Sequence, residues 1–290
     1  MTNVENKQVG GTPAQTQPSQ PGIESEMNPL PTQPYDYTGS DKLKGKVAII
    51  TGGDSGIGRA VAVAYAKEGA NLVINYLEKE QSDAEETKSI VEKEGIKAIL
   101  VEGDIADYET SKKLVQSAID EFGQINIVVN NAAVQYPVDS FLDITVEQWD
   151  KTFRTNIDSM FYLSKEALPH LGQGDSIICT TSVNAYRGHS ILIDYTATKG
   201  AIVGFVRSLA QNVADKGIRV NMVAPGPIWT PLIPSTFDAS QVEEFGTDTP
   251  LKRPGQPSEL AGSYVLLASQ DGSYITGQCI HVNGGSIMSS

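Results

Sequence analysis

From Lys46 to the end of the chain, short apolar runs alternate with stretches that repeat apolar positions every three or four residues. The apolar runs are rich in Val and Ile, which is typical of strands buried on both faces of a parallel sheet. The pattern predicts strands at Lys46–Thr51, Asn71–Tyr76, Ala98–Val101, Ile125–Asn130, Ser176–Thr180, Ile218–Val223 and Gln278–Val282. It predicts helices at Arg59–Gly69, Ser82–Gly95, Tyr108–Phe122, Thr145–His170, Ile193–Val213 and Pro257–Ala268.

Strands and helices that alternate in one series favour an α/β fold with a doubly wound parallel sheet. We therefore expect a Rossmann-type seven-stranded parallel sheet with helices on both faces. The segment after the sixth strand is too short for an added substrate domain of ordinary size. Residues 42–290 are expected to form one domain.

Residues 1–41 differ from the rest of the chain, because they are rich in Gln, Thr, Pro and Gly and show no periodicity. Such a segment cannot bury much apolar surface alone, so we interpret it as a flexible N-terminal extension. The alternative concerns residues 28–37 (NPLPTQPYDY), whose Leu, Pro and Tyr side chains would suit a segment lying along a folded surface.

The chain carries 35 acidic and 22 basic side chains, for a formal net charge of −13. Nucleic acids and anionic membranes are bound through clustered Lys and Arg, so neither is expected as a partner. A single anionic cofactor stays compatible with this charge, because backbone amides can hold it locally.

The two cysteines, Cys179 and Cys279, have no second Cys or His at ligand spacing, so neither a metal site nor a disulfide is expected. The chain also shows no basic-then-apolar leader and no apolar run of membrane-spanning length. We expect a cytoplasmic protein.

A glycine-rich turn, Thr51–Gly58 (TGGDSGIG), lies between the first strand and the first helix. Gly52, Gly56 and Gly58 fall where the chain must turn sharply and where a backbone could approach a pyrophosphate closely. The following helix N-terminus offers free N–H groups and a favourable dipole. This placement favours a nucleotide cofactor over a purely structural turn.

Further motifs follow in order at the carboxyl ends of the later strands or on the adjoining helices. With the glycine turn, they resemble the short-chain dehydrogenase/reductase family from about Leu43 to the C-terminus. One departure is Ala133, where the family often has Gly. The motifs are Asp104, the NNAA sequence at Asn130–Ala133, Asn156, Ser182, Tyr195 with Lys199, and Pro225 with Gly226.

Tyr195 and Lys199 are four residues apart on a predicted helix and so share a face. Reduction of a carbonyl by a nicotinamide needs a proton on oxygen, and a tyrosine with a free pKa of about 10 can supply it when a nearby cation lowers that pKa. We expect Lys199 to lower the pKa of Tyr195. The alternative is an incidental surface pair, which the surrounding motifs disfavour.

The resemblance implies roles for the other site residues. Ser182 would hydrogen-bond the substrate oxygen, and the alternative is a loop-capping serine. Asn156 would position a water that relays protons to Lys199, and the alternative is a polar residue at a helix kink. Lys199 would also hold the nicotinamide ribose.

The resemblance further implies a cofactor-binding set, in which Asp104 contacts adenine and Ile228 and Thr230 meet the nicotinamide carboxamide. The set is Gly52, Asp54, Ser55, Gly56, Ile57, Gly58, Tyr76, Asp104, Ile105, Asn131, Ala132, Tyr195, Lys199, Pro225, Gly226, Ile228 and Thr230.

The end of the second strand usually decides between NAD and NADP. Tyr76 stands where NAD enzymes often carry Asp, and Leu77 where NADP enzymes often carry Arg, so both usual markers are missing. Arg59 and Lys79 could reach a 2′-phosphate, but Glu78 and Glu80 add negative charge. We expect NAD, with use of NADP left open.

The resulting hypothesis is an oxidoreductase that transfers a hydride between a nicotinamide cofactor and a small carbonyl or alcohol substrate. The alternative is a catalytically silent cofactor-sensing or scaffold protein of the same fold. The loop Pro227–Pro250 is expected to cover the pocket and line it with Trp229, Leu232, Ile233 and Phe237. His189 is interpreted as an ordinary surface or core residue; the alternative is a pocket-lining residue, because it lies between Ser182 and Tyr195. The resemblance implies a homotetramer built on the helices Thr145–His170 and Ile193–Val213.

Overall fold

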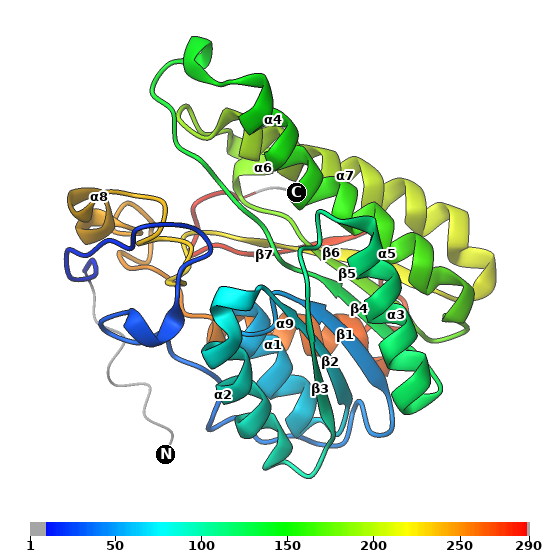
Figure 1. The fold of residues 1–290 in the computed structure, drawn as a ribbon. Coiled ribbons are helices and arrows are strands. Elements are labelled where there is room, and N and C mark those ends of the chain that lie inside the picture. The colour runs from blue at the N-terminus through cyan, green and yellow to red at the C-terminus, as the bar shows by residue number, and fades with distance from the viewer. Residues whose placement is uncertain (1–9, 289–290) are drawn as a thin grey trace.

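The computed structural model describes residues 10–288 and contains one seven-stranded sheet in which every strand pairing is parallel (Figure 1). The strand order β3-β2-β1-β4-β5-β6-β7 reverses direction between β1 and β4. This confirms the doubly wound Rossmann-type fold and places a topological switch point beside β1. The strands are β1 (Val47–Thr51), β2 (Asn71–Tyr76), β3 (Ala98–Glu102), β4 (Ile127–Asn130), β5 (Ser176–Thr180), β6 (Arg219–Pro225) and β7 (Cys279–Val282).

Two helical layers cover the sheet, as Figure 1 shows. One layer contains α1 (Gly56–Lys67), α2 (Gln81–Glu92) and α9 (Ser258–Ala268). The other contains α3 (Tyr108–Phe122), α4 (Val146–Phe153), α5 (Ser159–Ala167) and α7 (Ile193–Val213). Adjacent residues of β1 lie in the hydrophobic cores on opposite faces of the sheet. Ile50 packs in the cluster with α1 and α9, and Ile49 packs in the cluster with α3 and α7. This alternation explains why the strand reads as continuously apolar.

The segment expected as one helix at Thr145–His170 is divided. Between α4 and α5 lies a π-helical turn at Arg154–Asp158, and a 3-10 turn follows α5 at Leu168–His170. The π turn contains Asn156, whose side chain hydrogen-bonds the backbone of Val134 outside the helix. The helix therefore departs from α geometry where Asn156 contacts a residue outside it. Helical periodicity in the sequence does not reveal such a contact.

Two short helices were not expected from the sequence. They are α6 (Asn184–Arg187), directly after the β5 edge, and α8 (Ala239–Glu244), in the long segment before α9. Both are too short to leave a periodic pattern, and α8 begins at a capping box in which Asp238 accepts from the amide of Gln241.

The N-terminal arm, defined here as residues 10–41, lies against the segment between β6 and α9 (Figure 1). Gly10 N donates to Lys252 O at 2.9 Å, Gln17 N to Pro234 O at 2.6 Å, and Ser258 N to Thr32 O at 3.1 Å. The interpretation as a flexible extension is therefore wrong for residues 10–41. Backbone hydrogen bonds hold the arm against this segment, although the arm itself has little apolar surface to bury. Residues 1–9 lie outside the described residues.

Over residues 10–288, no helix has the length and hydrophobicity needed to cross a membrane. The same residues contain no group of three or more His, Cys, Asp or Glu side chains arranged to hold a metal ion. Both cysteines are free.

Candidate active site

The glycine turn joins β1 to α1 in a conformation that depends on its glycines. Gly52 and Gly56 have φ values of +57° and +51°, a region that side chains disfavour. A Cβ at Gly58 would lie 1.8 Å from the backbone oxygen of Gly52, so helix and turn approach as closely as glycine allows. The turn therefore leads directly into the N-terminus of α1, where the Gly56 amide donates to Glu24 Oε2 at 2.5 Å. A glycine turn before a helix N-terminus is the arrangement that binds phosphate groups.

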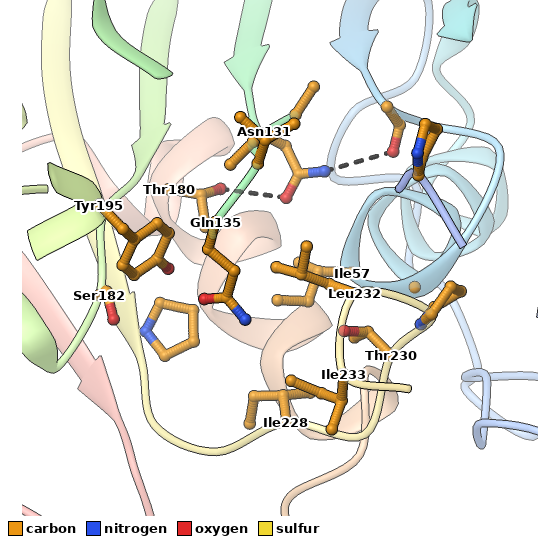
Figure 2. Close-up of a pocket in the computed structure, with 18 of the residues that line it drawn as sticks. Ile57, Asn131, Gln135, Thr180, Ser182, Tyr195, Ile228, Thr230, Leu232 and Ile233 are labelled. Carbon is orange, nitrogen blue, oxygen red and sulfur yellow. Dashed lines mark hydrogen bonds between the residues drawn. The ribbon is translucent and has the colours of Figure 1, made fainter. Parts of the chain in front are cut away.

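Hydrogen bonds tie together the carboxyl ends of β1, β4 and β5. The Asn131 amide donates to Thr51 Oγ1 at 2.9 Å, and its side chain donates to the backbone oxygens of Thr51 and Gly52. Thr180 Oγ1 donates to Asn131 Oδ1 at 3.2 Å (Figure 2). Asn131 was expected at the site, whereas Thr51 and Thr180 were missed. Each of these threonines could have been found in the sequence as a hydroxyl residue at the last position of a largely apolar strand.

One pocket runs along this edge of the sheet and brings the expected site residues together (Figure 2). Two expected residues do not line it: Gly58 lies behind the turn, and Asn156 lies within the helical layer. Expected residues that line the pocket are Gly52, Asp54, Ser55, Gly56, Ile57, Tyr76, Asp104, Ile105, Asn131, Ala132, Ser182, Tyr195, Lys199, Pro225, Gly226, Ile228 and Thr230.

Ser182, Tyr195 and Lys199 occupy one end of this pocket. Tyr195 and Lys199 lie one turn apart on α7, and the Lys199 Nζ atom is 5.3 Å from the centre of the Tyr195 ring. Nζ also donates to the backbone oxygen of Thr180 at 2.9 Å. Ser182 lies beside Tyr195 (Figure 2) and accepts from the Asn184 amide at 3.1 Å, so it also caps the loop after β5.

Burial controls the ionisation of both α7 residues. It raises the pKa of Tyr195 to about 12, against a lowering effect of the hydrogen bond with Ser182. Burial also lowers the pKa of Lys199 to about 7. The expected lowering of the Tyr195 pKa by Lys199 is therefore not seen, because desolvation by burial is the largest effect on both groups.

Asn156 is fully buried, and both polar atoms of its side-chain amide are hydrogen-bonded. Oδ1 accepts from Val134 N and Nδ2 donates to Val134 O, each at 2.8 Å, and Nδ2 also reaches Thr198 Oγ1 at 3.2 Å. It therefore connects the loop after β4 to α7 one residue before Lys199. These contacts fit the alternative considered from the sequence, a polar residue at a helix irregularity.

The opposite end of the pocket, at β2, is acidic. Tyr76 donates a hydrogen bond from its hydroxyl to Gln81 Oε1, and Leu77 N donates to Glu80 Oε2 at 3.0 Å. Asp54 is 1% exposed, and its two carboxylate oxygens have no hydrogen-bond partner within residues 10–288. Burial raises the pKa of both Asp54 and Glu80. The negative charge of Asp54 raises the pKa of Glu80 further.

The two cations near this end already have partners. Arg59 is buried and contacts Glu24 at 2.9 Å, Glu86 at 3.1 Å and the backbone oxygen of Asp54 at 2.8 Å. Lys79 Nζ is 3.2 Å from the hydroxyl of Ser19. Neither Arg59 nor Lys79 is among the residues that line the pocket.

The segment after β6 covers the pocket with apolar side chains, among them Leu232, Ile233 and Phe237, as expected. Trp229 was expected to line it but is fully buried in a separate cluster with Met27, Ile233 and Val242. The interpretation of His189 as an ordinary residue was also wrong, because it lines the pocket. The sequence did not reveal the contact between Met27 and Trp229, since these residues are 202 positions apart.

A comparison with protein families matches residues 52–286 to the model described as enoyl-(acyl carrier protein) reductase. A solved short-chain dehydrogenase from Burkholderia cenocepacia, in complex with NADP, is 30% identical with a TM-score of 0.79; the match covers 84% of this chain and 98% of that one. The chain belongs to the short-chain dehydrogenase/reductase family. It is an oxidoreductase of that family, and nicotinamide cofactor binding is supported for it.

Two curated relatives are similar over nearly their whole length. The uncharacterized oxidoreductase YhdF of Bacillus subtilis is 60% identical, over 99% of this chain and all of the relative. The glucose and ribitol dehydrogenase of Daucus carota is 48% identical, over 96% of this chain and 98% of the relative.

Proposed function

We propose that this protein transfers a hydride between a nicotinamide cofactor and a small carbonyl or alcohol substrate, with Tyr195 as the general acid and base. The observation that carries the proposal is the buried group of Ser182, Tyr195 and Lys199, which faces the same pocket as the glycine turn. A silent cofactor-sensing protein would have no need for all three polar groups at this edge.

The residues at the pocket suit a dinucleotide. Gly58 has no room for a side chain, Gly56 has a positive φ, and the N-terminus of α1 suits a pyrophosphate beside the Glu24 carboxylate that accepts from Gly56 N. When bound, the nicotinamide supplies or accepts the hydride. Lys199 would hold the adjoining ribose, and Asn156 would keep Thr198 and the loop at Val134 in place beside it.

Tyr195 would then exchange a proton with the substrate oxygen, and Ser182 would hydrogen-bond that oxygen as charge develops on it. The high pKa of buried Tyr195 favours the protonated phenol, which is the form needed to reduce a carbonyl. Oxidation of an alcohol needs the tyrosinate, so charged neighbours must lower that pKa in the loaded enzyme.

The surroundings of β2 support a preference for NAD. A 2′-phosphate would approach Asp54 and Glu80, where burial already disfavours negative charge, while Arg59 is held by Glu24 and Glu86. The related Burkholderia cenocepacia structure holds NADP, so a preference for NAD would rest on this chain's own residues at that end of the pocket.

The proposal is tested by following NADH and NADPH oxidation with a panel of aldehydes, ketones and sugars, and NAD or NADP reduction with polyols. We expect turnover with wild type that disappears in Tyr195→Phe. Tight cofactor binding without turnover on any member of the panel would instead support the silent alternative.

We also propose a homotetramer that works in the cytoplasm. Large apolar side chains on and before the α4–α5 helices are exposed in the single chain, which supports burial between subunits. They are Phe141, Leu142, Val146 and Phe161, with 65%, 88%, 70% and 48% of their surface exposed.

A further inference from the structure

The N-terminal arm reaches the pocket through Gln20. The side-chain amide of Gln20 pairs with both backbone polar groups of Gln135: Gln135 N donates to Gln20 Oε1 at 3.1 Å, and Gln20 Nε2 donates to Gln135 O. Pro21 and Gly22, the next residues of the arm, line the same pocket as Tyr195. A Cβ at Gly22 would lie 2.3 Å from Pro231 O, so arm and covering segment are in close contact there.

Gln135 itself lies at the substrate end of the pocket. It is 4% exposed, and Figure 2 shows its side-chain amide between Tyr195 and the segment carrying Leu232. Its Nε2 donates to Thr236 Oγ1 at 3.2 Å. Within residues 10–288 its Oε1 accepts no hydrogen bond, although it is not enclosed by protein. A free acceptor beside Tyr195, in a lining that is otherwise largely apolar, suits a hydroxyl group of the substrate.

The arm is anchored before Gln20, where Gln17 N donates to Pro234 O at 2.6 Å, and at two places after it, so it can hold Gln135 firmly. On the cofactor side, the buried carboxylate of Glu24 accepts from Gly56 N at 2.5 Å and pairs with Arg59 at 2.9 Å. On the substrate side, Trp229 Nε1 donates to Pro29 O at 2.9 Å, and Met27 packs against Trp229. The arm therefore connects the phosphate-binding turn to the segment that covers the pocket.

From these contacts we infer that Gln20 is a positioning residue for Gln135, and that Gln135 selects substrates bearing a hydroxyl group close to the reacting carbonyl or alcohol carbon. This inference deepens the proposed function and rests on it. The arm is then a wall of the active site, since without Gln20 the backbone at Gln135 loses two hydrogen bonds and its side chain loses its fixed direction.

The chain offers a matched control for removing Gln20. Gln15 makes the same two-way pairing with a backbone unit, accepting from Asn28 N at 2.9 Å and donating to Asn28 O, but its partner lies within the arm. Gln20→Ala and Gln15→Ala therefore delete the same pair of bonds at two places, Gln15→Ala also removing a 3.2 Å bond to Pro13 O, and only Gln20→Ala affects the pocket.

The test compares both variants with wild type on glyceraldehyde and propanal, which differ in hydroxyl groups, and measures amide hydrogen exchange at Gln135. In Gln20→Ala we expect the kcat/KM ratio of glyceraldehyde to propanal to fall about tenfold, mainly through KM, and exchange at Gln135 to quicken at least tenfold. Gln15→Ala should change neither quantity.

Equal ratios in wild type and Gln20→Ala, or unchanged exchange at Gln135, would overturn the inference. Gln20→Glu provides a second variant, because its carboxylate can still accept from Gln135 N while the donor to Gln135 O is lost; its exchange should lie between wild type and Gln20→Ala. Failure of the proposed function is distinguishable, since it would abolish cofactor oxidation with both aldehydes and leave the exchange difference intact.

Discussion

The Nζ atom of Lys199 lies 5.3 Å from the centre of the Tyr195 ring, yet its hydrogen bond goes to the backbone oxygen of Thr180 at the end of β5. Both residues are buried, so the pair is held as a neutral phenol beside an amine whose pKa of about 7 leaves it partly uncharged near neutral pH. The ionisation of this pair therefore depends on the charge and solvent that other groups bring to the pocket.

Tyr195→Phe removes the phenol oxygen and leaves the ring packing in place. We expect kcat to fall by about 10² or more, as is usual for loss of a general acid. The dissociation constant of the cofactor and the melting temperature should stay near the wild-type values. Stopped-flow turnover with cofactor titration checks this, and turnover close to wild type would remove Tyr195 from the chemical step.

Replacing Lys199 should reveal the cost of burying its amine. The pKa of Lys199 is lowered in the folded chain, so the unfolded chain binds more protons between pH 7 and 10.5, and stability rises with pH across that window. Lys199→Met lacks this dependence. We expect the ligand-free variant to be more stable than wild type at pH 7 and below, with the difference shrinking toward pH 10.

Urea unfolding at pH 6, 7, 8.5 and 10 measures that difference, with the exposed Lys216→Met as the control. The same Lys199 variant should bind the cofactor more weakly, because its amine would hold the ribose. A stability difference that does not change with pH would show that Lys199 titrates normally, and an unchanged cofactor dissociation constant would refute the ribose role.

The parallel sheet could be predicted from the sequence because its signal is local: each strand is a run of Val and Ile, and Gly52 and Gly56 must lie where φ is positive. The site residues on strand ends followed from the same pattern and from family motifs. The π turn at Asn156 could not be predicted, because its partner is the backbone of Val134 across a loop.

The arm was beyond sequence reasoning for a related reason. Its contacts use Gln20, Glu24 and backbone groups, whose partners Gln135 and Gly56 are distant in the chain. A low content of apolar residues correctly indicates that the arm cannot form a core alone, but it says nothing about hydrogen bonds to a surface that is already folded. The buried state of Trp229 depends on that same arm.

Leu77→Arg should shift cofactor use toward NADP. Leu77 lines the pocket beside Glu80, and a guanidinium there would give a 2′-phosphate a partner and offset nearby negative charge. We expect the ratio of kcat/KM for NADPH to that for NADH to rise about tenfold. Leu77→Met keeps the size without the charge and should leave the ratio unchanged; equal ratios in the two variants would place the specificity elsewhere.

The final prediction concerns the assembly built on α7. Gly204 lies in the middle of this helix, and a Cβ there would meet no atom of residues 10–288 within 4 Å beyond its own helix turn, so a larger side chain fits the single chain without strain. If subunits pack across this face, Gly204→Leu must push them apart, because close helix contacts have no space for an extra side chain. We expect a smaller mass in solution at micromolar concentration, while circular dichroism keeps its native helical signal. Gly172→Leu, at a loop position that is similarly open, is the control and should keep the wild-type mass. An unchanged tetramer in Gly204→Leu would exclude this face of α7 from the interface, and a monomeric wild type would exclude the tetramer itself.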